Sequence, residues 1–216
     1  MACLRRPTFV YGWVTVLTAV ALLGASSPTT SQQTISPAER RAQINRVLDG
    51  LNSPDPTTRL VTLESAAAGS DANLRRIALS TAFASSDSVL RAAALTATLG
   101  TSATFVVDMA PVQGGQGVLQ GTGGSFEVRV LRFNRATGSF ESATRFAKRN
   151  ETLVPFPAAV SGDRISFDAG FWFPNDLTRE CSGVARLESG GTTLKGTMGC
   201  TGTGEERYAI KIDILR

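Results

Sequence analysis

The spacing of apolar residues changes once along the chain, close to residue 100. Over residues 37–100, leucine, isoleucine and alanine recur with the spacing of a helix face. From residue 101, apolar and polar residues alternate with a period of two, and glycine-rich turns separate the runs. The pattern predicts the α+β class: about four short helices in residues 37–100, followed by an antiparallel β-domain of about eight strands in residues 101–216.

The helical segment carries a sixteen-residue repeat that begins at an aspartate. An arginine follows each aspartate after four places and a leucine after eight. The three copies are Asp55–Arg59–Leu63, Asp71–Arg75–Leu79 and Asp87–Arg91–Leu95. A fainter upstream copy holds Glu39, Gln43 and Val47 in the same places. Because aspartate accepts hydrogen bonds from the free N–H groups of a first turn, and Pro56 suits the first helical position, we expect a helix to begin after each aspartate.

The stretches DANLRRIALS and DSVLRAAALT, residues 71–80 and 87–96, resemble the Asp-x-x-Val/Leu-Arg-x-x-Ala core of HEAT-like helical repeats. The resemblance covers residues 37–100 and implies stacked helices that bind other proteins, with aspartate and arginine forming ladders between neighbouring repeats. The chain departs from that family by carrying the core once per helix, not once per helix pair. The alternative interpretation is a small capped bundle with solvated arginines.

The β-domain alternates most clearly in residues 126–130, 165–169 and 208–214. Many short strands joined by tight turns are typical of an antiparallel barrel or sandwich. The architecture resembles small up-and-down, lipocalin-like barrels, although the chain carries no lipocalin signature motif. That likeness concerns architecture alone, because a fold does not determine a function.

The stretch CSGVARLESGGTTLKGTMGC, residues 181–200, predicts one complete hairpin. A two-residue turn at Gly190 and Gly191, both with positive φ, places Cys181 opposite Cys200. In this register the two cysteines share a face with the apolar residues, and a slip of one residue would separate them. Facing residues lie within disulfide range, so we expect a structural disulfide and not a reactive or metal-binding pair.

The N-terminus predicts export. Residues 1–26 combine a basic start, an apolar run and a small-residue cleavage site, which is the pattern of a secretory signal peptide. The alternative is a membrane anchor formed by residues 9–25, at the lower limit of a membrane span. Residues 27–36 are polar without a period and predict a linker. A periplasmic or extracellular location also suits the cysteine pair, because disulfides persist there.

Composition narrows the possible functions. Signal cleavage would remove two of the 22 basic residues and none of the 18 acidic residues, and a net charge of about +2 does not indicate nucleic-acid binding. The absence of histidine excludes Ser-His-Asp and Cys-His nucleophile systems and histidine-based metal sites. No glycine-rich nucleotide-binding motif occurs. We therefore expect a non-enzymatic protein without a metal or cofactor.

One face of the run 164–172 carries the best candidates for ligand contact. Trp172 lies on the face opposite the apolar positions, together with Arg164 and Asp168. An exposed tryptophan at a barrel rim suits a ligand, and the alternative is a tryptophan packed beneath a loop. A pair of carboxylates across a sugar would indicate a hydrolase, whereas the alternative is ordinary surface and turn positions. The carboxylates in question are Asp163, Asp168, Asp176 and Glu180.

The leading functional hypothesis is an exported binding or scaffold protein whose helical segment contacts another envelope or extracellular protein. The first alternative is a carrier that holds a small amphiphile or lipid in the mouth of the barrel. The second alternative is a carboxylate-based hydrolase. Membrane contact is expected only through an uncleaved N-terminal segment.

Overall fold

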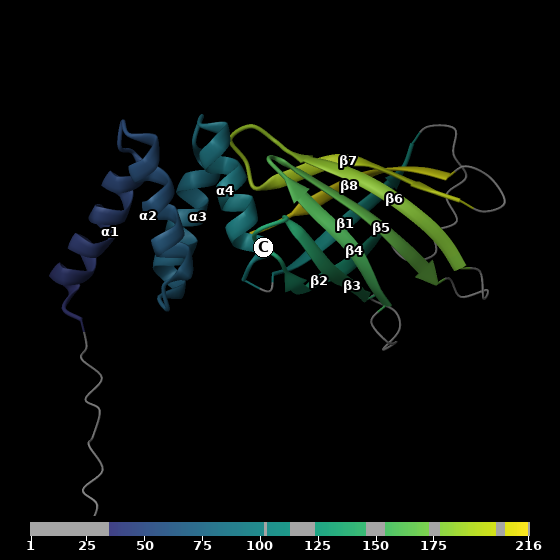
Figure 1. The fold of residues 1–216 in the computed structure, drawn as a ribbon, viewed down its shortest axis with the longest axis horizontal. Helices are drawn as coiled ribbons and strands as arrows, with labels where there is room; N and C mark the ends of the chain where they lie inside the picture. The colour runs from purple at the N-terminus through teal and green to yellow at the C-terminus, as the bar shows by residue number, and fades with distance from the viewer. Residues whose placement is uncertain are drawn as a thin grey trace, which may run out of the picture. The chain divides into compact units, whose positions relative to one another are not determined.

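The computed structural model describes residues 35–101, 103–112, 124–145, 154–172, 178–201 and 206–215. The expected signal peptide or anchor, and nearly all of the expected linker, lie outside the described residues. Within these ranges no helix is both long enough and apolar enough to cross a membrane. The fold class is the expected α+β, with four helices followed by eight antiparallel strands (Figure 1).

Four consecutive helices form the first part of the fold, and a polar side chain caps each at its start. They are α1 (Pro37–Leu51), α2 (Pro56–Ala68), α3 (Ala72–Ala84) and α4 (Ser88–Leu99). Asp55, Asp71 and Asp87 each accept two backbone N–H groups of the following turn. Ser36 and Glu39 form a reciprocal capping box at α1. The prediction that helices begin just after the three aspartates is therefore confirmed.

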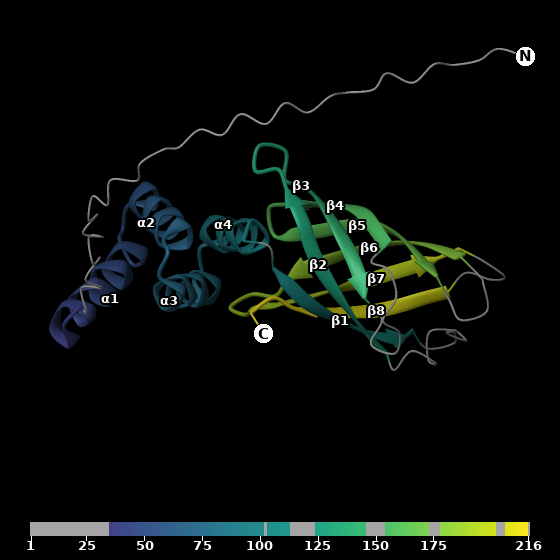
Figure 2. The same cartoon turned by 90° about the horizontal axis from the view of Figure 1, so that it is seen from below.

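The helices pack in a two-layered stack. Each contacts the next helix along the chain, and α1 also contacts α3 while α2 contacts α4. Figure 2 shows these two layers, α1 with α3 and α2 with α4. The leucines of the repeat, Leu63, Leu79 and Leu95, are buried. Because helices of this length are marginal alone, burial of these side chains is what holds each of them in place.

Eight strands close into a barrel in which each strand pairs with its neighbours along the chain and β1 pairs with β8. The strands are β1 (Thr104–Pro111), β2 (Ser125–Phe133), β3 (Ser139–Arg145), β4 (Val154–Ser161), β5 (Arg164–Trp172), β6 (Thr178–Leu187), β7 (Thr193–Cys200) and β8 (Glu206–Asp213). Closure selects the barrel over the sandwich. Alternate residues of the strands point inward and are buried, as the period of two predicts.

The β6–β7 hairpin has the predicted register but a different turn. Cys181 pairs with Cys200, and their sulfur atoms form a disulfide. Gly191 N–H donates to Glu188 C=O, and of the two glycines only Gly190 has a positive φ. The expected two-residue turn is therefore wrong. The strands are joined by a longer loop whose turn needs one left-handed residue at Gly190, which glycine supplies without a steric cost.

Gly196 in β7 lies where the backbone of β6 leaves no room for a side chain. A Cβ at this position would lie 1.8 Å from Val184 O and 2.6 Å from Ala185 Cα. These obstructing atoms belong to the backbone, so they cannot move aside without shifting the β6–β7 pairing. Gly170 in β5 offers the opposite environment, because a Cβ there would meet nothing within 4 Å.

We expect Gly196→Ala to lower the free energy of unfolding by about 2–4 kcal/mol, because the methyl group overpacks a rigid site. The control Gly170→Ala should change it by less than about 0.5 kcal/mol. Urea denaturation followed by circular dichroism measures both values. Equal stability of the two variants would contradict the close approach of β6 and β7.

Candidate functional site

Two arginine–aspartate pairs connect α1 with α3 and α2 with α4. Arg40 of α1 binds the carboxylate of Asp71 at the start of α3 through both of its terminal nitrogens. Arg59 of α2 binds Asp87 at the start of α4, with Nη2 2.7 Å and Nε 3.2 Å from Oδ2. The same carboxylates cap α3 and α4. We call these two pairs the ladder.

The ladder shifts the protonation of its members. The hydrogen bond from Arg40 is the largest cause that lowers the pKa of Asp71, and Asp71 in turn raises the pKa of Arg40. The hydrogen bond from Arg59 likewise lowers the pKa of Asp87. The pKa of Asp55 is lowered mainly by the Thr58 hydroxyl and least by the charge of Arg59, and in the described part of the chain Asp55 forms no ion pair with an arginine.

The repeat arginines also hold the ends of the preceding helices. Arg75 donates to Ala67 O and Gly69 O at the end of α2. Arg91 donates to Ser85 O at the end of α3. These two side chains were expected in the ladder, but within the described ranges they bind carbonyl groups and no aspartate. The ladder therefore has two pairs, and its continuation would require further capped helices after α4, where strand β1 begins.

Arg40 is a ladder member that the repeat did not reveal. It lies four residues after the cap Ser36, as Arg59 lies four residues after Asp55. Alignment of the upstream copy on Glu39 placed it three residues too late, because the cap of α1 is Ser36. The capping pattern Ser-x-x-Glu at residues 36–39 was the signal that gives the correct alignment.

A groove of about 480 Å³ opens between α1, α2 and the start of α3. We call it the helical groove. Val61 is 58% exposed, and Gln43 Oε1 is buried without a hydrogen-bond partner among the described residues. Asp71, held by the ladder, lies at its edge. The groove is lined by these residues together with Arg46, Val47, Thr62, Ser65, Ala66, Gly69, Ser70 and Leu74.

The interior of the barrel is almost filled by side chains. Its cavity measures about 20 Å³, which is room for about one water molecule. The lining is apolar except for Ser142, whose hydroxyl is fully buried and has no partner among the described residues. A ligand of drug size does not fit this interior without displacing side chains.

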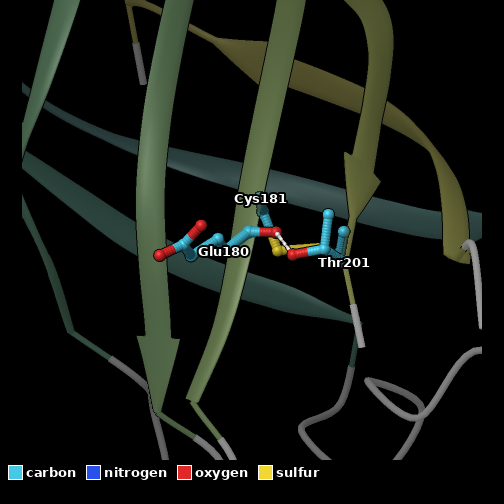
Figure 3. The surroundings of a disulfide bond; sticks show 4 residues. Glu180, Cys181 and Thr201 are labelled. Carbon is cyan, nitrogen blue, oxygen red and sulfur yellow. Dashed lines mark hydrogen bonds between the residues drawn. A yellow bond between two sulfur atoms is a disulfide. The ribbon is translucent and has the colours of Figure 1, made fainter. Parts of the chain in front are cut away.

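The disulfide is a structural element inside the barrel wall. Cys181 and Cys200 are 2% and 4% exposed, so neither sulfur is accessible to a substrate. Next to them, the Thr201 N–H and hydroxyl both donate to Glu180 C=O, as the dashed line for the hydroxyl shows in Figure 3. These contacts extend the β6–β7 pairing by one step beyond the disulfide.

The structure does not gather the predicted ligand residues into one site. Arg164 and Trp172 stand at opposite ends of β5, about 26 Å apart along the strand. Asp168 lies between them and lines a hollow of about 540 Å³ with Glu180 of β6. The side chain of Trp172 lies outside the described residues, so its expected exposure remains a prediction.

The carboxylates considered for hydrolysis are also dispersed. Asp163 forms an ion pair of 2.8 Å with Arg186. Asp176 lies outside the described residues, which leaves Asp168 and Glu180 as the two carboxylates of one hollow. No group of three metal-ligating side chains occurs in the described ranges.

Comparison with known proteins gives little further information. No known protein family matches the chain, and no curated protein matches it. A solved structure of EF1p2_mFAP2b bound to DFHBI is similar at 12% sequence identity, over 55% of this chain and 95% of the other, with a TM-score of 0.36. Similarity at this level supports no conclusion about fold or function. The resemblance of residues 37–100 to HEAT-like repeats therefore remains a prediction.

We expect Asp71→Asn to destabilise the protein at pH 7 more than Asp55→Asn does. Asparagine caps a helix as well as aspartate, so the two variants differ mainly in the lost attraction between Arg40 and a charged carboxylate. Urea denaturation at a series of pH values provides the measurement.

The pH dependence follows from the lowered pKa of Asp71. A carboxylate whose pKa is lower in the folded state stabilises the fold above its unfolded pKa of about 4, and this stabilisation declines as the pH falls below that value. The stability difference between the wild-type protein and Asp71→Asn should therefore shrink between pH 5 and pH 2. A difference that is independent of pH would contradict the ladder.

Replacement of both Cys181 and Cys200 by alanine should lower the free energy of unfolding by about 3 kcal/mol, because the disulfide closes a loop of 20 residues. Reduction of the wild-type protein should cause a similar loss. Peptide mapping of the unreduced protein should recover the two residues in one linked pair. Free thiols at both positions would contradict the disulfide.

Proposed function

We propose that the protein is an exported, non-enzymatic binding protein whose helical stack binds a segment of another protein in the envelope or extracellular space. The observation that carries the proposal is the helical groove. A volume of about 480 Å³ accommodates several side chains of a peptide. The resemblance of the helices to HEAT-like repeats supports the same function.

The chemistry of the groove favours a peptide with both apolar and polar contacts. Val61 presents an exposed methyl surface to an apolar side chain. Gln43 Oε1 is a buried acceptor without a donor, and a backbone N–H group of a peptide would supply one. Arg46 adds a positive charge at the same groove. An extended peptide segment with one apolar side chain and an acidic neighbour would make all three contacts.

The ladder favours binding by fixing the walls of the groove. Arg40 and Asp71 join α1 to α3, and both helices contribute residues to the lining. A groove whose walls are already held in place loses less conformational entropy when a peptide binds. Export is supported by the Cys181–Cys200 disulfide, because disulfides persist in oxidising compartments, and by the signal-like N-terminus.

We expect Val61→Asp to abolish capture of the partner protein and Val89→Asp to leave it unchanged. Val89 is the matched control, because it is an exposed valine on α4 and does not line the groove. The measurement is affinity capture from the native envelope and secreted fractions with each variant, followed by binding titration of the captured protein. Each variant must first show the unfolding midpoint of the wild-type protein.

The two variants distinguish the helical groove from other surfaces. Loss of binding with Val61→Asp alone supports the groove. Equal binding by both variants, or equal loss, would contradict it. A second variant, Gln43→Leu, removes the unpartnered acceptor and should weaken the same interaction by about five- to tenfold, the effect of one hydrogen bond.

A further inference from the structure

Among the described residues, the pairing between β4 and β5 has the shortest register of any two neighbouring strands. Their register extends from Ser161–Arg164 at the hairpin to Ala158–Phe167, and it stops there. The remaining residues of β4, from Val154 to Pro157, pair with β3 only. Asp168 and the residues after it in β5 pair with β6 only. We call this incompletely paired boundary the seam.

Two prolines explain why the pairing stops. Val160 N–H donates to Gly138 C=O on the β3 side of the strand. Because successive N–H groups of a strand point to opposite sides, positions 155 and 157 point toward β5. Both are prolines, which have no N–H to donate. Pro155 and Pro157 therefore cannot form the two hydrogen bonds that would continue the pairing between β4 and β5.

The interior cavity lies directly behind the seam. Phe156 and Ala158 of β4, and Ile165 and Phe167 of β5, line it from the two sides. The rings of Phe156 and Phe167 face each other edge to face across the seam, with centroids 6.2 Å apart. Ala158 and Phe167 are each only 8% exposed, so side chains close the seam over the cavity in this structure.

Ser142 supplies the one polar group in this lining. Its side chain belongs to β3, next to β4, lines the cavity and is buried from solvent. The hydroxyl has no hydrogen-bond partner in the described part of the chain. Burial of an unpaired hydroxyl destabilises the fold, and a bound molecule with a complementary polar group would remove that cost.

We propose that the barrel interior binds a small aromatic molecule with one hydroxyl or carbonyl group, which enters through the seam and hydrogen-bonds Ser142. The ring packs among the phenylalanines that line the cavity, which are Phe105, Phe126, Phe140, Phe156 and Phe167. The closed cavity of about 20 Å³ is too small for a ring, so Phe156 and Phe167 swing outward on binding. The binding-competent state is a minor one, and the affinity is reduced accordingly.

The test uses phenol and toluene, which differ by the hydroxyl group that Ser142 would bind. The oxidised full chain is labelled at isoleucine methyl groups and titrated while methyl NMR spectra are recorded. Ile165 and Ile212 line the cavity, whereas Ile44 and Ile77 belong to helices. Phenol should shift the signals of the first pair and leave the second pair unchanged.

Ser142→Ala should weaken phenol binding about tenfold and leave toluene binding unchanged, because only phenol loses a hydrogen bond. Absence of shifts at Ile165 and Ile212, or shifts spread equally over helical methyl groups, would overturn the proposal. So would equal loss of both probes in Ser142→Ala. Val61→Asp, which alters the helical groove, should bind phenol as the wild-type protein does. The proposal for the groove and the proposal for the barrel interior are therefore tested separately.

The route through the seam has its own test. Pro157→Val restores an N–H that points toward β5, and the added hydrogen bond should slow phenol exchange several-fold. Ala159→Val is the control, because Ala159 already pairs with Ser166 in the closed part of the same strand. Slower exchange with Pro157→Val alone supports the seam. Equal exchange rates in both variants would overturn this route.

Discussion

Backbone N–H and C=O groups that folding removes from water need new partners, and this requirement shapes both parts of the chain. In the helices, the sixteen-residue repeat supplies these partners at the start of one helix and at the end of the preceding helix. An aspartate accepts the free N–H groups of a first turn, and four residues later an arginine donates to the carbonyl groups that end the preceding helix. The spacing of four thus places one cap on each side of every junction between helices.

The barrel meets the same requirement by closure, because a sheet closed on itself has no free edge. The seam is the place where closure is incomplete, since Pro155 and Pro157 cannot donate toward β5. Stability and access to the interior are therefore coupled at one boundary. The β3–β4 and β5–β6 pairings on either side of the seam are longer, so opening either of them would break more hydrogen bonds.

Much of this fold could be predicted from local signals in the sequence. Aspartates at intervals of sixteen residues located three helix starts, and the cysteines fixed the β6–β7 register because one slip would separate them. The turn of that hairpin could not be fixed in the same way. Several loop lengths allow the same pairing, and two adjacent glycines permit more than one of them.

The candidate sites were less predictable, because they depend on contacts between distant residues. Arg40 and Asp71 are 31 residues apart, and only the two-layered packing of the helices brings them together. The cavity beside Ser142 depends on how rings from five strands fill the barrel, which no local pattern specifies. The face that carries Arg164, Asp168 and Trp172 was predicted as a face, but a shared face along a strand is not a shared site.

The ladder connects the stability of the helical stack with the shape of its binding surface. Asp71 caps α3, binds Arg40 and lies at the edge of the helical groove. Loss of its charge would therefore weaken both the cap of α3 and the contact between α1 and α3. Because Arg40 lowers the pKa of Asp71, this carboxylate keeps its charge to a more acidic pH than an unpaired aspartate would. The same ion pair therefore maintains the cap of α3, the contact between α1 and α3 and the lining of the helical groove together.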